Sequence, residues 1–469
     1  MFIKELVIYN TIISLFIGTL ISGCSHNRLL RESLTQAGSN RSELERVLEH
    51  YASHPEKLAA ARFLIENMPA HYSYSGDSIY TYYSYADAIL SNTTLTPEQQ
   101  RDSLLCFTQN GYRYLTLHTI PDCRIITADF LIRDIDASFH LWKNCPWASH
   151  ITFDEYLEWL LPYKAVEYQE LDSWRDTLYT HFSYGLTHPI KNDVECNTTT
   201  GIADMIRSEV QSKVNRYGLY TPGGLPLLSD KLLHRQTFGN IPDYALLGTL
   251  AFRSMGIPTV IDETPVGPRH TAATRWFTVL MDRGDEQPSE WDLSTSIGNG
   301  FFPYERGPKV FRISYAIDKE RYLYKKRAKY IYPFDLGVKD VTANYFRTSD
   351  IKISIPHKER RKLKDRYVYI ASSLTQEENS YTISPEDKVI EHDWKIVDFG
   401  KIRGGKACFS DMGREVLYSI YGYDGTGLTP LVSPFILHKD GTIEYVSMDT
   451  VRSVHLDKWR NQPLNYLKK

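Results

Sequence analysis

Cysteine, histidine and acidic side chains are the groups in this sequence that could together form a nucleophilic catalytic site. A thiol attacks as thiolate, and it needs the positive end of a helix, a histidine as base, and a carboxylate or amide that orients this histidine. The sequence offers Cys196, His270 and Asp292 in that chain order. Whether they meet depends on the helices and strands that would carry them.

The clearest helix start of the chain carries no thiol. Residues 238–262 read FGNIPDYALLGTLAFRSMGIPTVID, which predicts a well-packed helix that ends near Gly256 and leads into a strand. Two further segments follow, TRWFTV at 274–279 and WDLS at 291–294. These segments supply a helix start, a strand start and a later acid, in that order.

In this order the segments resemble the core of the transglutaminase-like family. GNIPDYA matches a GxCxDxA-type helix start, FRSMGIP an LRxxGIP-type helix end, and TRWFTV an HxWN-type strand. The resemblance implies that Ile241 holds the nucleophile position, Thr274 the base position and Asp292 the position of the orienting acid, while Phe277 replaces the asparagine. Isoleucine has no nucleophilic atom, and threonine is no base at neutral pH. The expectation is a degenerate domain, a pseudoenzyme with no intact catalytic residues.

An active cysteine-type hydrolase or acyltransferase with relocated catalytic residues is the alternative. His270 could approach Asp292 through a shifted loop, and Cys196 could approach from the preceding segment. However, the surroundings of Cys196, VECNTTTGIA, do not predict a helix start aimed at His270. The surroundings of His270 are typical of an exposed loop.

The N-terminus has the pattern of a lipoprotein signal peptide. Lys4 precedes the apolar run IYNTIISLFIGTLIS, which is short for a membrane span and leads to Ile21-Ser22-Gly23-Cys24. The last four residues resemble the lipobox of bacterial lipoproteins, in which the cysteine is lipidated. The pattern therefore predicts a signal peptide at 1–23 and a lipid-anchored, extracytoplasmic protein. The outer membrane is favoured, and its periplasmic and surface faces both stay open.

Charge and cysteine content exclude several other classes. The 469 residues carry a formal net charge of −3, which gives no general attraction to nucleic acid. Two basic runs, Lys325-Lys326-Arg327 with Lys329 and the stretch 357–366, are interpreted as solvated loops or hairpin ends. The cysteines are scattered without a CxxC pair, so neither a disulfide framework nor a zinc site is predicted. We expect no metal, no cofactor and no nucleic-acid partner.

The chain divides into three regions after a predicted tether at 24–40. Residues 41–180 show helical periodicity, with an amphipathic stretch RSELERVLEHY and helices that start at Pro55 and Pro97. Residues 181–330, which hold the motif segments, mix helix and strand signals. Four tryptophans lie in the helical region, and their spacing favours a packed core over a ligand-stacking platform; they are Trp142, Trp147, Trp159 and Trp174.

Residues 331–469 are rich in strand signals. The segments IKISI, RYVYIA and WKIVDFG alternate, and Asp424-Gly425 and Asp440-Gly441 are typical of hairpin turns. This region is predicted to be a β-sandwich. The expected fold is thus α+β and multidomain, with a helical N-terminal region, a transglutaminase-like α+β core and a C-terminal β-sandwich.

The flanks of the motif segments resemble those of large bacterial lipoproteins that carry a transglutaminase-like domain, in FLIENMPAHYSY before and PFILHKDGTIEY after the core. The implied role is binding or scaffolding of a peptide or glycan ligand at the cell envelope. Carbohydrate recognition by the sandwich is a third class, with Tyr421, Tyr423 and Trp394 as candidate platforms. Many aromatic residues of alternating strands lie inside, which disfavours it.

Overall fold

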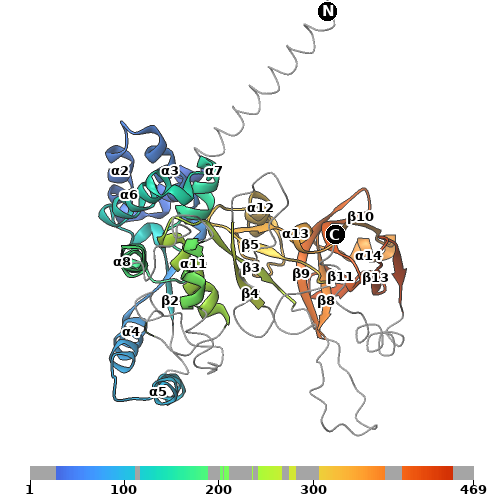
Figure 1. The fold of residues 1–469 in the computed structure, drawn as a ribbon. Coiled ribbons are helices and arrows are strands. Elements are labelled where there is room, and N and C mark those ends of the chain that lie inside the picture. Colours follow the sequence, from blue (N-terminus) through green and yellow to red (C-terminus); the bar gives the residue numbers. More distant parts are fainter. Residues whose placement is uncertain are drawn as a thin grey trace, which may run out of the picture. The chain divides into compact units, whose positions relative to one another are not determined.

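The computed structural model divides the chain into two compact units, one of residues 1–259 with 279–291 and one of 260–278 with 292–469 (Figure 1). The fold is mixed α+β, as predicted, with helices and antiparallel sheets. The division at 259/260 falls inside the segment predicted as core, and the predicted domain boundaries stay predictions. The structure describes residues 28–110, 117–187, 201–203, 205–210, 235, 241–266, 274–280, 306–374 and 393–446.

The first unit is built mainly from helices, and two of them start where the sequence predicts. Pro55 and Pro97 are the first residues of α3 and α5, where a proline's missing N–H costs no intrahelical bond. Strands β1 (Tyr72–Ser75) and β2 (His118–Pro121), which are separated in the chain by α4 and α5, pair as a two-stranded antiparallel sheet. The helices are α2 (Arg41–His50), α3 (Pro55–Asn67), α4 (Asp77–Leu90), α5 (Pro97–Asn110), α6 (Ala128–Asn144), α7 (Phe153–Glu155), η5 (Tyr156–Leu160), α8 (Trp174–Thr187) and α11 (Ile241–Ser254).

Tryptophans form part of the core of this unit, which confirms their predicted role. Trp142, Trp159 and Trp174 are buried. The Trp142 ring stacks on Tyr156 with ring centroids 4.7 Å apart, and its indole N–H donates to a backbone oxygen at 2.8 Å. Trp147 is half-buried, and its N–H donates to the carbonyl of Met255 just after α11. The aromatic side chains thus fix helix positions and are not a free stacking surface.

The second unit contains a four-stranded sheet in the order β4-β3-β5-β6. Its central pair β3 and β5 is antiparallel, with Asp262 opposite Arg312. Two helices accompany the sheet in sequence, α12 (Lys319–Arg327) and α13 (Thr342–Tyr345). The strands are β3 (Thr259–Thr264), β4 (Thr274–Val279), β5 (Phe311–Ile313) and β6 (Val338–Asp340).

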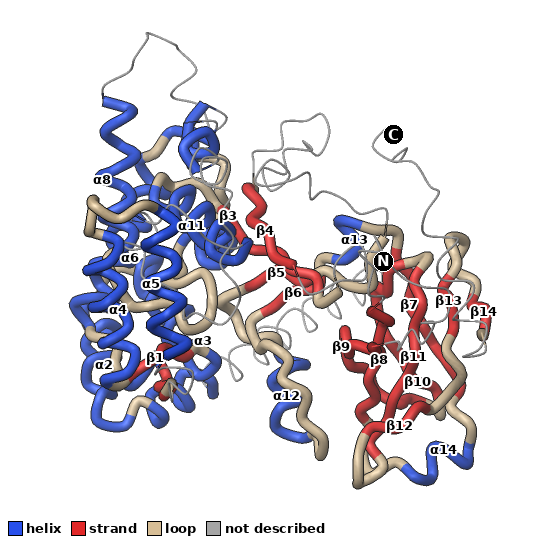
Figure 2. Tube along the Cα trace, turned by 90° about the horizontal axis from the view of Figure 1, so that it is seen from below, coloured by secondary structure: helices blue, strands red, loops and turns tan. Residues whose placement is uncertain are grey.

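An eight-stranded antiparallel sheet forms the rest of this unit, in the order β14-β13-β11-β8-β9-β10-β7, with β12 also paired to β11 (Figure 2). All its strands belong to one hydrogen-bonded sheet, so the division into two packed sheets of a sandwich stays a prediction. The elements are β7 (Thr348–Ser354), α14 (His357–Lys362), β8 (Tyr367–Leu374), β9 (Asp393–Arg403), β10 (Lys406–Gly413), β11 (Val416–Tyr423), β12 (Leu428–Pro430), β13 (Phe435–Leu437) and β14 (Ile443–Tyr445).

The two predicted Asp-Gly turns are present. Gly425 and Gly441 have φ of 110° and 87°, a backbone conformation that glycine adopts at little cost. The preceding carboxylates accept backbone N–H bonds two residues on, from Thr426 at 2.8 Å and from Thr442 at 2.9 Å. Local turn chemistry therefore explains both hairpins.

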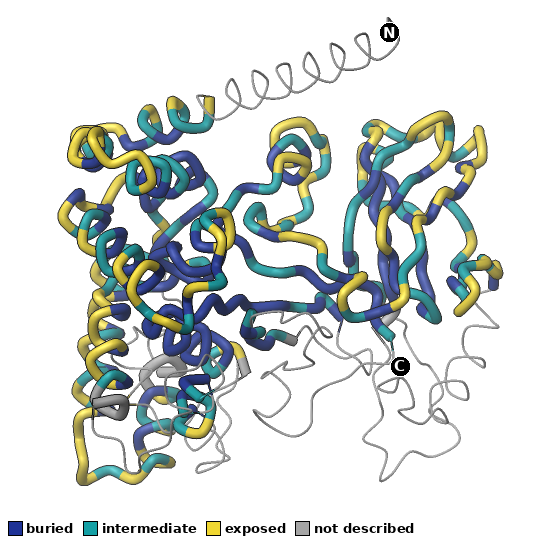
Figure 3. Tube along the Cα trace, turned by 45° about the horizontal axis from the view of Figure 1, so that its top comes forward, coloured by how far each residue is buried: buried dark blue, intermediate teal, exposed yellow. Residues whose placement is uncertain are grey.

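Consecutive residues of β8 from Tyr367 to Ser372 are buried, so both faces of the large sheet are covered along this strand. Figure 3 shows buried stretches in the strands of this unit. Val368 and Ile370 of β8 join an aliphatic core with β7, β10 and β11. Tyr367 and Tyr369, which point to the opposite face, pack in an aromatic cluster with Tyr324 of α12. Side-chain alternation along one strand thus builds two cores, and α12 belongs to the second.

No helix among the described residues is both long enough and apolar enough to cross a membrane. Residues 1–27, with the predicted signal peptide and Cys24, lie outside the described residues.

Candidate functional site

The backbone around the predicted catalytic positions has the expected elements. Helix α11 begins at Ile241, and strand β4 begins at Thr274. After α11, Gly256 has φ of 81° and β3 follows at Thr259, which matches the predicted helix end and strand. The remaining predicted site residues lie outside the described residues, as do the side chains of Ile241 and Thr274; they are Cys24, Cys196, His270 and Asp292.

A buried arginine holds the end of α11. Arg253 donates through Nε to the carbonyl of Thr259 at 2.7 Å and through Nη1 to that of Lys164 at 3.4 Å. Burial lowers the pKa of Arg253 to about 9, with a further contribution from the nearby charge of Arg175. The side chain therefore stays charged at neutral pH and links the end of α11 to the carbonyl of Thr259 in β3 and to that of Lys164. Its role is structural.

Asp262, at the end of the apolar stretch TVID, is a buried residue that sequence reasoning missed. Its carboxylate forms two bonds of 2.8 Å with Arg312 and accepts the hydroxyl hydrogens of Tyr345 and Thr278. Burial opposes the charge on Arg312, but its bonds to Asp262 raise the pKa of Arg312 above its usual value. A charged residue inside an apolar strand requires such partners. The aspartate in the stretch TVID was therefore a signal in the sequence for a buried ion pair. With its oxygens occupied, Asp262 is a structural group.

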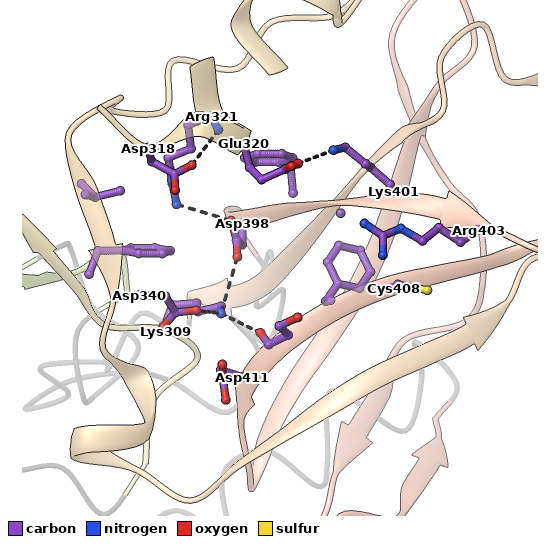
Figure 4. Close-up of a pocket in the computed structure, with 16 residues that line it drawn as sticks. Lys309, Asp318, Glu320, Arg321, Asp340, Asp398, Lys401, Arg403, Cys408 and Asp411 are labelled. Atoms are coloured by element: carbon purple, nitrogen blue, oxygen red, sulfur yellow. Dashed lines mark hydrogen bonds and ion pairs between the residues drawn. The ribbon is translucent and has the colours of Figure 1, made fainter. Parts of the chain in front are cut away.

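The second unit has a charged pocket of about 510 Å³ (Figure 4). Its walls come from β5, β6, α12, β9 and β10, so both sheets of the unit contribute. The lining residues include nine charged ones, Lys309, Asp318, Glu320, Arg321, Asp340, Asp398, Lys401, Arg403 and Asp411, and also Phe311, Val338, Phe399, Gly400, Cys408, Phe409 and Ser410.

A buried ammonium group lies at the base of the pocket. Lys309 has no exposed surface, forms ion pairs with Asp340 and with Asp398 at 3.5 Å, and donates to the carbonyl of Ser410 at 2.7 Å. Removing one partner from such a buried pair costs about 3–5 kcal/mol, because the other charge stays buried without compensation. The group therefore fixes the base of the pocket in one geometry.

Two β-bulges aim polar groups into this pocket. In the β8–β9 ladder, Ile370 pairs with Asp398 but Ala371 pairs with Ile396, so Val397 is an extra residue. In the β7–β10 ladder the register shifts between Phe409 and Met412, and Asp411 has φ of 46°. Bulges re-aim side chains and release backbone groups, and they concentrate near functional sites. Here they direct Asp398 to the pocket and free the Ser410 carbonyl for Lys309.

Arg321 forms the upper wall. Its guanidinium lies 4.6 Å from the ring centroid of Phe311 and 5.9 Å from that of Phe399. It also pairs with Asp398 at 3.4 Å, so this carboxylate is shared by two buried cations. The shared carboxylate and the aromatic faces stabilise the buried guanidinium charge of Arg321.

The rim is more exposed and its pairing is looser. Glu320 and Lys401 form an ion pair across the pocket mouth. Arg403 is exposed, and the structure gives its side chain no ion pair with a described residue. Half-exposed pairs contribute about 0–1 kcal/mol, so a ligand can replace one partner at little cost. The arrangement fits a polar ligand that bears both signs of charge.

The described residues of the pocket lining offer no thiol and histidine that could act together in catalysis. It has one thiol, Cys408, and none of its described residues is a histidine. Among the described residues, no group of three or more histidine, cysteine, aspartate or glutamate side chains could hold a metal ion. The expectations of no metal and no cofactor stay predictions. What the described pocket can do is bind, through fixed charges and aromatic walls.

Two other described thiols are held in the protonated form. Burial raises the pKa of Cys123 to about 11, with the charge of Asp122 adding to the effect, and burial also raises that of Cys145 to about 11. Because their folded pKa values lie above those of free thiols, these groups contribute stability below about pH 9, which is lost as the pH rises toward 11. Neither is a nucleophile at neutral pH.

We predict that Cys123 and Cys145 react slowly with iodoacetamide in the folded protein. A pKa of about 11 in place of 9 lowers the thiolate fraction of Cys123 and Cys145 about a hundredfold, so their alkylation at pH 7.5 should be roughly that much slower than that of a free thiol. The exposed Cys106 serves as the internal comparison. Peptide mapping by mass spectrometry measures each rate. Equal rates at all three thiols would contradict the prediction, and an unusually fast Cys196 would favour the relocated-nucleophile alternative.

Comparison of the chain with protein-family models, curated sequences and solved structures finds no match. The resemblance to transglutaminase-like proteins therefore stays a hypothesis that rests on the motif segments.

Proposed function

We propose that this chain is an extracytoplasmic lipoprotein that binds or scaffolds a peptide or glycan ligand at the cell envelope. In this proposal a degenerate, non-catalytic transglutaminase-like core connects a helical N-terminal region with a C-terminal β-sandwich. The helix that starts at Ile241 and the strand that starts at Thr274 support the assignment of the core. At those two positions the chain lacks the thiol and the imidazole that the chemistry requires.

The charged pocket of the second unit is the observation that carries the binding role. Its base is fixed by Lys309 and Asp398, while its rim pair, Glu320 with Lys401, can exchange partners. A rigid base with an exchangeable rim is suited to recognition, because the fixed groups are pre-organised and the rim adapts to the ligand.

Glycopeptides are the ligand class that fits this lining best. Peptide segments offer carboxylate and ammonium groups to the rim, and sugar hydroxyl groups can exchange hydrogen bonds with its charged side chains, such as Lys401 and Arg403. Fragments of the cell-wall glycopeptide unite both features and occur where an envelope lipoprotein would meet them. They are therefore the natural probe.

The proposed location rests on the residues around Cys24. Small residues at 22 and 23 precede this cysteine after a short apolar run. In this proposal the mature chain begins at Cys24, and its acyl chains attach it to the membrane.

Removal of the charge on Lys401 should weaken glycopeptide binding. We expect the wild-type protein to bind soluble cell-wall glycopeptide fragments in isothermal titration calorimetry, and Lys401→Gln to lower the affinity about tenfold through loss of one charge-assisted hydrogen bond. Lys352→Gln is a matched control, since Lys352 and Lys401 flank Cys408 in the sheet register but only Lys401 lines the pocket. Equal affinities for wild type and Lys401→Gln, or no binding at all, would refute the assignment.

Replacement of Cys24 should release the protein from the membrane. An exported Cys24→Ala protein should appear in the soluble fraction, and the wild-type N-terminal peptide should carry the mass of acyl chains. Fractionation followed by mass spectrometry measures both. Export with unchanged membrane association of Cys24→Ala would argue against the lipid anchor, and it would leave the pocket assignment unaffected.

A further inference from the structure

Two basic segments that are distant in sequence meet at one end of the eight-stranded sheet. The segment after α12 contacts the segment after α14, because the backbone N–H of Lys329 donates to the carboxylate of Asp365 at 2.6 Å. The ring of Tyr330 lies 5.5 Å from that of Tyr423, and the N–H of Lys364 donates to the carbonyl of Tyr423 at 2.9 Å. Figure 2 shows α12 and α14 at this end.

The hairpin between β9 and β10 brings further cations to the same end. The N–H of Ile355, just before α14, donates to the carbonyl of Gly405 at 3.1 Å, and the Arg360 guanidinium lies against Gly405. Arg403 and Lys406 flank this turn and are exposed. Three segments therefore form one surface, which we call the basic end.

Among the residues that the structure describes, most cations of the basic end have no carboxylate partner. Exposed side chains for which the structure gives no ion pair with a described residue are Lys325, Arg327, Lys329, Lys358, Arg360, Arg361, Lys364, Arg366, Arg403 and Lys406.

The described acidic residues of the basic end already have partners within it. Glu359 pairs with Lys362, and Asp365 accepts two backbone N–H bonds. Asp424 accepts bonds within its own turn, and those bonds lower its pKa. The basic end thus has a strong positive surface on a chain whose net charge is −3.

An apolar loop lies among these cations. Residues 330–334 read YIYPF, and Ile331 is 57% exposed, among the most exposed large hydrophobic side chains of the described chain. Tyr330 and Tyr332 are half-buried, so each ring has one packed and one accessible part. A protruding aliphatic side chain between tyrosines and lysines is the composition of a membrane-interface contact.

We propose that the basic end docks on an anionic lipid bilayer surface, with Ile331 inserted at the headgroup level. Lysines and arginines near such a surface each contribute to binding. The exposed Ile331 side chain favours lipid over nucleic acid, because a bilayer offers it an apolar contact and a phosphate backbone does not. This contact goes beyond the proposed function, because it is a second membrane contact, made by the folded second unit and independent of the N-terminal lipid.

The test uses the full chain with vesicles of phosphatidylcholine alone or mixed equally with phosphatidylglycerol. Since the N-terminal segment could attach the chain to either vesicle, the readout is local: backbone hydrogen exchange of 325–334 and 357–366. If nine chains in ten are docked, exchange in these segments slows about tenfold on anionic vesicles and stays unchanged on neutral ones. The difference should disappear at high salt, which screens exposed charges.

Charge-removal variants make the test specific. Replacing Lys325, Lys329, Lys358 and Arg361 with Gln should weaken docking roughly a hundredfold or more and abolish the protection. The matched control removes four exposed lysines outside these segments and should keep it; these are Lys319, Lys339, Lys352 and Lys439. Unchanged exchange in β8 and β11 shows that both variants are folded.

Three results would overturn the proposal. One is equal protection on neutral and anionic vesicles, and another is full protection of the patch variant. The third is tighter binding of a short DNA or RNA than of anionic vesicles, which would assign the basic end to nucleic acid. Loss of the lipid anchor in Cys24→Ala would not change the exchange result, so the two membrane contacts are tested separately.

Discussion

The buried ammonium group of Lys309 is the constraint on which the second unit depends. It lies just before β5 and reaches a carboxylate of β6, a carboxylate of β9 and a carbonyl of β10. A buried cation must keep these partners, so the two sheets cannot shift past each other without a cost of several kcal/mol. The bulges in β9 and β10 place two of those partners, Asp398 and the Ser410 carbonyl, within reach of Lys309.

From this constraint follow the two surfaces that we assign to function. The base of the pocket is rigid because its charges are mutually neutralised, while the rim and the basic end keep cations available to ligands. The aromatic core around Tyr324 connects them, since it packs α12 on the sheet and so positions both the Arg321 wall and the loop at Ile331. A polar ligand and an anionic surface could thus be held by one folded unit.

Much of the local structure could be predicted from the sequence. The prolines predicted the starts of α3 and α5, and the Asp-Gly pairs predicted two turns. These predictions are confirmed because such signals act over only a few residues. The helix start at Ile241 and the strand start at Thr274 were also predicted. The pocket was not predicted, because Lys309 and Asp398 are distant in sequence and the strand pattern of WKIVDFG does not reveal the bulge that turns Asp398 toward the pocket. The two basic runs were interpreted separately, and only the fold shows that they meet.

We propose that the chain keeps the helix and strand starts of a thiol site at Ile241 and Thr274 but lacks the reactive groups. The most direct measurement is the alkylation rate of an Ile241→Cys, Thr274→His double variant at neutral pH, compared with each single variant. A thiolate at a helix start beside a histidine should have a lowered pKa, so only the double variant should gain a fast-reacting thiol. Wild-type amide hydrolysis or transamidation that is abolished by Cys196→Ala or His270→Ala would contradict the account.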